Sequence, residues 1–92
     1  MRLHITGGDG PTVISQSLPI RIRSVLIDRE DEDAVNLKIV DSTGDVTPVG
    51  GFQWSFMGWN EQCLPTVTAT LTAPTSVTAT IYYDVGRIVY DD

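Results

Sequence analysis

Residue types that build reactive sites are nearly absent from this chain of 92 residues, which has one cysteine, Cys63, and one histidine, His4. A single cysteine cannot form a disulfide within the chain. One cysteine and one histidine are also too few for a structural zinc site, which needs four ligands. Histidine is the side chain most often used for proton transfer near neutral pH, and His4 is the only one; no Gly-x-Ser-x-Gly elbow surrounds any serine. We therefore predict no enzyme, no cofactor and no metal, with His4 an ordinary strand residue and Cys63 a small buried hydrophobe.

Basic residues are also scarce, since six stand against twelve acidic residues and the net charge is −6. Phosphate backbones repel an acidic domain, so we predict no nucleic-acid partner. No run approaches the ~20 apolar residues that cross a bilayer, and no signal-peptide core opens the chain. We predict no membrane contact and synthesis in a reducing cytoplasm. A single domain over residues 1–92 buries only ~60–65% of its unfolded surface, which favours added stability from a homo-oligomer or a larger partner.

Helical periodicity is missing as well, because no window of eleven residues carries the i, i+3, i+4, i+7 apolar pattern without an interruption. Short runs rich in Val, Ile and Thr recur instead, separated by Gly, Pro, Asp and Ser. This pattern predicts an all-β protein, a small antiparallel β-sandwich or jelly-roll-like domain of about eight short strands. The expected strands are Leu3–Thr6, Thr12–Gln16, Ile20–Ile27, Ala34–Val40, Phe52–Phe56, Thr66–Thr72, Val77–Tyr83 and Arg87–Tyr90.

Residues 66–83 show the clearest pattern, since threonines alternate with aliphatic residues at a period of two. One face of each strand is then apolar and the other hydroxylated. A hairpin must place core residues opposite core residues, which favours the three-residue loop 74–76 with Ala73 opposite Val77. The alternative is that the chain crosses between two sheets at Pro74. The hydroxyl side predicts a solvent face, and a surface of Thr70, Thr72, Thr78 and Thr80 that binds sugar or ice is the less favoured hypothesis.

Two other segments alternate in the same way. Strand 20–27 is expected to place Ile20, Ile22 and Leu26 on one face. The segment after Gly50-Gly51 is expected to place Phe52, Trp54 and Phe56 together on a core face, against small residues such as Ala69 and Ala79.

Charged and glycine-rich segments favour structural interpretations. The acidic run 28–33 predicts a solvated turn over a calcium loop, since Asp33 stands where an EF-hand needs glycine. Arg21 and Arg23 are expected to pair with acidic residues across strands, and a docking pair for an acidic partner is the alternative. Residues 7–11 predict a flexible turn, because no P-loop lysine or following helix accompanies the glycines.

The layout of the whole chain resembles a known family. It opens LHITGGDGPTVIS, continues IRIRSVLIDREDED-x-VNLKIVDSTGD and closes on a Thr/Val-rich strand ending in Ile81-Tyr82-Tyr83. This order is similar to small structural proteins of tailed bacteriophages, particularly β-sandwich proteins that decorate or cement capsids. The central segment FQWSFMGW, residues 52–59, departs from that pattern.

The resemblance implies a non-catalytic virion protein on the capsid surface, assembled in the host cytoplasm, which binds and stabilises the finished shell. The implied partners are the major capsid protein or another virion protein, and further copies of the chain in a homotrimer. Residues 1–12 are our candidate docking arm. The candidate partner-binding residues are Leu3, His4, Ile5, Met57 and Trp59. A tail or fibre adaptor is the alternative structural role.

Overall fold

The computed structural model describes residues 1–86, which form two antiparallel β-sheets packed face to face. No described element is a helix, and so none is a helix that could cross a membrane. The strands are β1 (Arg2–Thr6), β2 (Thr12–Ser15), β3 (Ile20–Asp28), β4 (Asn36–Asp41), β5 (Gly44–Asp45), β6 (Phe56–Cys63), β7 (Val67–Thr72) and β8 (Thr78–Val85). The predicted strand Arg87–Tyr90 lies outside the described residues.

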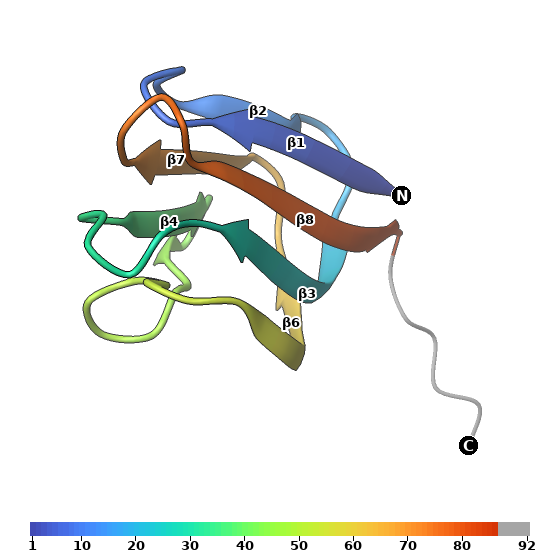
Figure 1. Cartoon of the computed structure of the whole chain (residues 1–92). Helices are drawn as coiled ribbons and strands as arrows, with labels where there is room; N and C mark the ends of the chain where they lie inside the picture. Colours follow the sequence, from blue (N-terminus) through green and yellow to red (C-terminus); the bar gives the residue numbers. More distant parts are fainter. Residues whose placement is uncertain (87–92) are drawn as a thin grey trace.

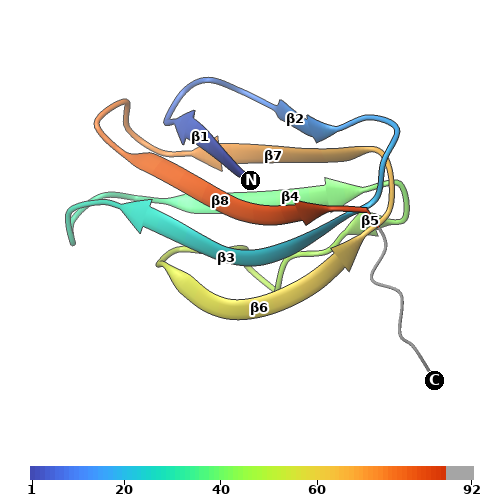
Figure 2. The same cartoon turned by 90° about the vertical axis from the view of Figure 1, so that its right-hand side faces the viewer.

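Each sheet has four strands, and the two form the layers visible in Figures 1 and 2. Sheet A has the order β1-β8-β3-β6, and sheet B has the order β2-β7-β4-β5. Every connection except that from β4 to β5 passes from one sheet to the other. This order is that of an eight-stranded jelly roll, a double-sheet sandwich built from Greek keys. The predicted fold class is therefore confirmed.

The core lies between the sheets and is almost wholly aliphatic. Alternation explains it, because the side chains at every second position of β4, β7 and β8 point inward. The buried apolar residues are Ile5, Ile20, Ile22, Val25, Ile27, Val35, Leu37, Ile39, Phe52, Cys63, Val67, Ala69, Leu71, Val77, Ala79, Ile81 and Tyr83.

The two threonine-rich strands do not pair with each other. β7 lies between β2 and β4 in sheet B, whereas β8 lies between β1 and β3 in sheet A. The hairpin that sets Ala73 opposite Val77 is therefore wrong, and the chain crosses between sheets at Pro74, whose carbonyl accepts the amide of Val77 at 3.0 Å. Both arrangements put the same side chains in the core, so parity alone does not distinguish them.

A glycine permits the close approach at this crossing. The amide of Gly7 donates to the carbonyl of Val77 at 2.9 Å. A Cβ at Gly7 would lie 2.0 Å from the carbonyl oxygen of Pro74, which is far inside van der Waals contact. The turn after β1 therefore packs directly on the β7–β8 crossing, and any side chain at position 7 would force the two apart.

The aromatic segment does not form the predicted strand Phe52–Phe56. Phe52 makes a single bridge to Leu37 of β4, and β6 begins only at Phe56. The chain between them passes from sheet B to sheet A, where the hydroxyl of Ser55 accepts the amide of Ile27 at 2.8 Å. Phe52 is buried, but Trp54 is 52% exposed and Phe56 is 46% exposed. The shared aromatic core face is therefore wrong, because a crossing segment does not keep a period of two.

A bulge in β3 overturns the predicted face of that strand. The register with β8 shifts between Ile22 and Ser24, so Arg23 is an extra residue relative to β8. An extra residue reverses the side-chain alternation beyond it. Ile20 and Ile22 point inward as predicted, but Val25 and Ile27 then replace Leu26 in the core, and Leu26 is 39% exposed.

Candidate functional site

The predicted partner-binding residues fall into two groups with different exposure. His4 is exposed, and Met57 is 69% exposed. Ile5 is 1% exposed and belongs to the core, while Leu3 is half-buried against it. Trp59 is also half-buried, with its ring edge-on to Phe52 at 4.8 Å between centroids. Of the five residues, the structure leaves His4 and Met57 with freely available side chains.

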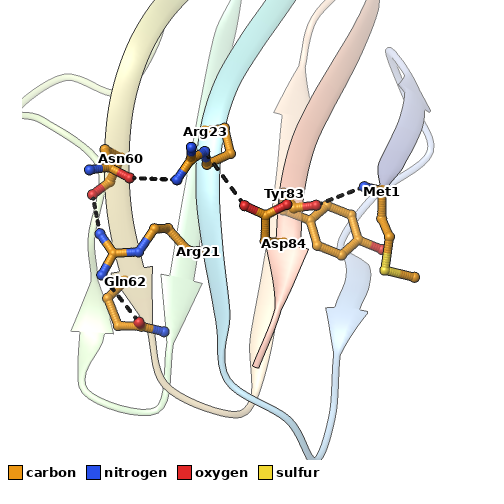
Figure 3. Close-up of polar contacts among 7 residues, drawn as sticks. All are labelled: Met1, Arg21, Arg23, Asn60, Gln62, Tyr83 and Asp84. Atoms are coloured by element: carbon orange, nitrogen blue, oxygen red, sulfur yellow. Dashed lines mark hydrogen bonds and ion pairs between the residues drawn. The ribbon is translucent and has the colours of Figure 1, made fainter. Parts of the chain in front are cut away.

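The segment 1–12 is built into the fold and is not a free arm. Strand β1 pairs with β8 in a regular register from Arg2↔Tyr82 to Thr6↔Thr78, and β2 begins at Thr12. The N-terminal ammonium of Met1 donates to the carbonyl of Tyr83 at 2.9 Å, which continues the pairing to the first residue (Figure 3). Strand β1 is an edge strand of sheet A.

His4 and Met57 share the outer face of sheet A. In the register across the four strands, Met57 is opposite Ser24, Ser24 is opposite Tyr82, and Tyr82 is opposite Arg2. His4 lies in the next row, opposite Thr80, whose hydroxyl is 2.8 Å from its Nδ1 atom. Three strand spacings, or about 14 Å, separate β1 from β6.

Leu26 completes this face, because it lies opposite Thr80 between His4 and the β6 edge. We call Leu26, Met57, Tyr82 and His4 the sheet A face. Sequence reasoning missed Leu26, since an uninterrupted alternation places it in the core. The residue types of β3 do not indicate a bulge at Arg23, so the exposure of Leu26 could not be predicted from the sequence.

A second bulge, in β6, shapes the edge of this face. Three residues, Gly58 to Asn60, stand opposite Arg23 alone, and both Gly58 and Asn60 have positive φ, 76° and 56°. The bulge presents Met57 on the outer face while Trp59 remains against Phe52.

Two arginines hold the β6 bulge in place, as Figure 3 shows. Arg21 donates from Nη1 to the carbonyl of Asn60 at 3.0 Å, and Arg23 donates from Nη1 to its Oδ1 atom at 3.2 Å. Arg23 also pairs across strands with Asp84 at 3.5 Å. The predicted cross-strand ion pair is therefore found for Arg23.

Arg21 departs from that prediction, because its contacts are with neutral groups. Its second contact is a long hydrogen bond from Nη2 to Oε1 of Gln62 at 3.4 Å. Arg21 is 8% exposed, and its Nε atom is buried without a hydrogen-bond partner among the described residues. Burying a guanidinium without a hydrogen bond to every N–H group costs stability. The hydrogen bond from Arg21 to the Asn60 carbonyl, which holds the β6 bulge, offsets part of that cost.

Two further buried titratable side chains, Cys63 and Asp41, lie near the C-terminal end of β6. Cys63 is fully buried, and burial raises the pKa of its thiol to about 12, with further increases from the charges of Asp41 and Glu61. Such a thiol stays protonated and is a poor nucleophile. Within residues 1–86, no three His, Cys, Asp or Glu side chains gather to hold a metal ion.

Asp41 ties the β4–β5 turn to the chain after β6. Burial raises the pKa of its carboxyl, but hydrogen bonds from the Thr43 hydroxyl and from the amides of Leu64, Thr43 and Gly44 outweigh burial, so the pKa lies below its ordinary value. The amide of Leu64 donates at 2.9 Å, and that of Thr43 donates at 2.8 Å. The carboxylate therefore links the β4–β5 turn to the chain that follows β6.

The threonines of the proposed sugar or ice surface do not form one surface. Thr70 and Thr72 lie on β7 in sheet B, and Thr78 and Thr80 lie on β8 in sheet A. The hydroxyl sides of the two strands face away from the common core, on opposite faces of the sandwich. A single four-threonine surface is thus excluded by the topology.

Comparison of the chain with protein-family models, with curated protein sequences and with solved structures gave no match.

Proposed function

We propose that this protein is a capsid cement protein of a tailed bacteriophage, which binds the assembled shell through the sheet A face and stabilises it without catalysis. The observation that carries the proposal is the exposure of Leu26 and Met57, 39% and 69%, on the outer face of sheet A. Interfaces commonly combine methionine and aromatic side chains with a polar rim. Tyr82, His4 and Arg2 supply such surroundings on the neighbouring strands.

The free edge of β1 supports docking by strand addition. In its antiparallel pairing the Met1/Tyr83 and Gly7/Val77 positions are hydrogen-bonded, so Arg2, His4 and Thr6 turn their backbone groups outward. The outward backbone groups of Thr6 are already bonded to Asp9. The Thr6 amide donates to Oδ2 of Asp9 at 2.9 Å, and the Asp9 amide donates to the Thr6 carbonyl at 3.1 Å. A strand of the shell protein that paired with β1 would therefore engage Arg2 and His4 and end at Thr6.

Charge and size fit the same role. A net charge of −6 keeps free copies soluble and apart before they dock. A domain of 92 residues gains stability from added buried area, which we assign to a homotrimer seated on the capsid. The jelly-roll architecture occurs in viral capsid proteins, lectins and cupins, and is compatible with the proposal.

Particle composition tests the proposed role directly. We expect the protein in purified particles of the phage that encodes it, in a copy number of the same order as the major capsid protein. Particles lacking it should release DNA at lower temperature than wild-type particles. A copy number of a few per particle would instead establish the tail or fibre adaptor, and absence from particles would refute both structural roles.

Binding to empty capsids of the same phage tests the surface. We expect Leu26→Asp and Met57→Asp each to reduce co-sedimentation with capsids, because each places a charge inside an apolar contact. Val13→Asp is the matched control, since Val13 is 47% exposed on β2 of the opposite sheet. Equal loss for all three variants would contradict docking through the sheet A face.

A further inference from the structure

A groove beside Trp54 and sheet B combines an aromatic ring with several polar side chains, as ligand sites commonly do. One cavity of about 530 Å³ is lined by Arg29, Asp31, Gln53, Trp54, Asn36 and Thr72, among others. A second, of about 480 Å³, extends over β4 and β7 and is lined by Asn36, Lys38, Val40, Thr70 and Thr72. Asn36 and Thr72 line both cavities, so the two form one groove that runs from the β3–β4 loop and the segment before β6 onto the outer face of sheet B.

Trp54 is the aromatic platform of this groove, and Arg29 packs against its ring. The guanidinium of Arg29 lies over the indole, 4.1 Å from the ring centroid. Arg29 is itself held by backbone carbonyls, since it donates to Gln53 at 2.7 Å, to Asp31 and Glu30 at 3.2 Å each, and to Asp33. Trp54 nevertheless remains 52% exposed. A large apolar ring that packs against Arg29 and stays half exposed offers apolar area to a ligand, and the contact with Arg29 lowers the cost of ordering it.

Polar groups line the rest of the groove on regular strands. Asn36 lies opposite Thr72, and Lys38 lies opposite Thr70, so hydroxyl, amide and ammonium groups alternate across the β4–β7 pair. Asn36 is oriented by a hydrogen bond from Nδ2 to the carbonyl of Gly50. These groups offer both donors and acceptors along the two strands.

The charges of the lining indicate a neutral ligand. Arg29 and Lys38 contribute positive charge, and Asp31 and Asp33 contribute negative charge, so neither an anion nor a cation finds a field of one sign. A fatty ligand is disfavoured too, because its binding would strand these polar groups without water. A chain of sugar rings supplies hydroxyls for the polar groups and apolar ring faces for the indole.

We propose that this groove binds a short, neutral, linear oligosaccharide, with one sugar ring against Trp54 and further rings over Asn36, Thr72 and Thr70. The site is separate from the sheet A face, because its strand residues lie on the outer face of sheet B, on the other side of the sandwich. A shell-bound copy would therefore keep the groove open to an external glycan.

The test uses the full chain on an array of neutral linear glucans, mannans and galactans, followed by calorimetric titration with the strongest binder. We expect binding at about 1 mM or tighter, accompanied by a change in tryptophan fluorescence. Trp54→Ala should lower the affinity at least about tenfold, and Thr72→Val, which only replaces a hydroxyl by a methyl group, should lower it severalfold. Met57→Ala is the matched control on the opposite face and should bind as the wild type does.

Three results would overturn the proposal. The first is the absence of binding to every neutral glycan on the array. The second is tighter binding of oligolysine or oligogalacturonate, which would identify an ionic site. The third is wild-type affinity in folded Trp54→Ala and Thr72→Val proteins, which would place the sugar elsewhere. Circular dichroism of each variant establishes that it is folded.

Discussion

The two outer faces of the sandwich differ although both sheets follow the same alternating pattern. Sheet B keeps its register along the β4–β7 pair, and its outer face carries the threonines, Asn36 and Lys38 that the alternation places there. Sheet A contains two bulges around Arg23, and its outer face carries Leu26 and Met57. The β4–β7 pair exposes what the alternation predicts, including Val40 at 38%, whereas the bulge in β3 brings to the surface a residue, Leu26, that uninterrupted alternation places in the core.

The effect of the bulge in β3 is largest in a comparison of two leucines. Leu37 of β4 is fully buried, and Leu26 of β3 is 39% exposed, although alternation places both in the core. Leu37→Ala should lower the free energy of unfolding by about 2–5 kcal/mol through lost burial and a cavity. Leu26→Ala should change it by less than about 0.5 kcal/mol. Urea denaturation of both variants checks this, and similar losses would mean that Leu26 is in the core and that the bulge is absent.

The sequence predicted burial well wherever strands are regular. In residues 67–71 and 77–81 every second residue is buried as the alternation requires. What it left open was which strands pair, since a hairpin and a crossing at Pro74 satisfy the same parity. Pairing depends on contacts between distant segments, such as the packing of Gly7 on Pro74, which no local pattern contains.

The candidate surface was predictable only in part. Met57 was expected at an apolar contact because it ends the aromatic segment, and the structure exposes it. Ile5 was expected in a docking arm, but the pairing of β1 with β8 buries it. The groove beside Trp54 could not be foreseen, because its residues come from β4, β7 and two loops that only the fold brings together.

Removing the Asp41 carboxylate should have the next largest effect. Asp41→Asn loses part of a buried set of hydrogen bonds that joins the β4–β5 turn to Leu64, and should cost about 1–3 kcal/mol. The pKa of Asp41 is lower in the folded protein than its ordinary value of 3.8, because the hydrogen bonds it accepts outweigh the opposing effect of burial. Its contribution is therefore complete above the unfolded pKa and is lost as the pH falls through the folded pKa.

Urea unfolding midpoints, measured from neutral to acidic pH, test whether stability falls with pH in this direction. The wild type should lose stability as the pH falls below about 3.8, and Asp41→Asn should lose less over the same interval. Parallel curves for the two proteins would show that other carboxylates govern acid unfolding.

The β6 bulge offers a smaller test that acts on sheet A alone. Gly58 has a φ of 76°, and no atom lies within 4 Å of a Cβ built there. Gly58→Ala should therefore cost about 1–2 kcal/mol from backbone strain alone. It should also weaken capsid binding, since the bulge sets the position of Met57. Unchanged stability would mean that β6 tolerates a regular strand in this region, and the sugar affinity of sheet B should not change in either case.

The smallest effects are expected from two ion pairs of equal length, one on each sheet. Arg23 pairs with Asp84 in sheet A, and Lys38 pairs with Asp45 in sheet B, both at 3.5 Å and with side chains about half exposed. Exposed pairs contribute little, so Lys38→Met should leave the urea midpoint unchanged. Arg23→Met should cost on the order of 0.5 kcal/mol, because Arg23 also holds the Oδ1 atom of Asn60 in the bulge. If added salt removes the whole effect of Arg23→Met, the ion pair alone accounts for it; if the effect persists in salt, Arg23 acts chiefly by holding the bulge.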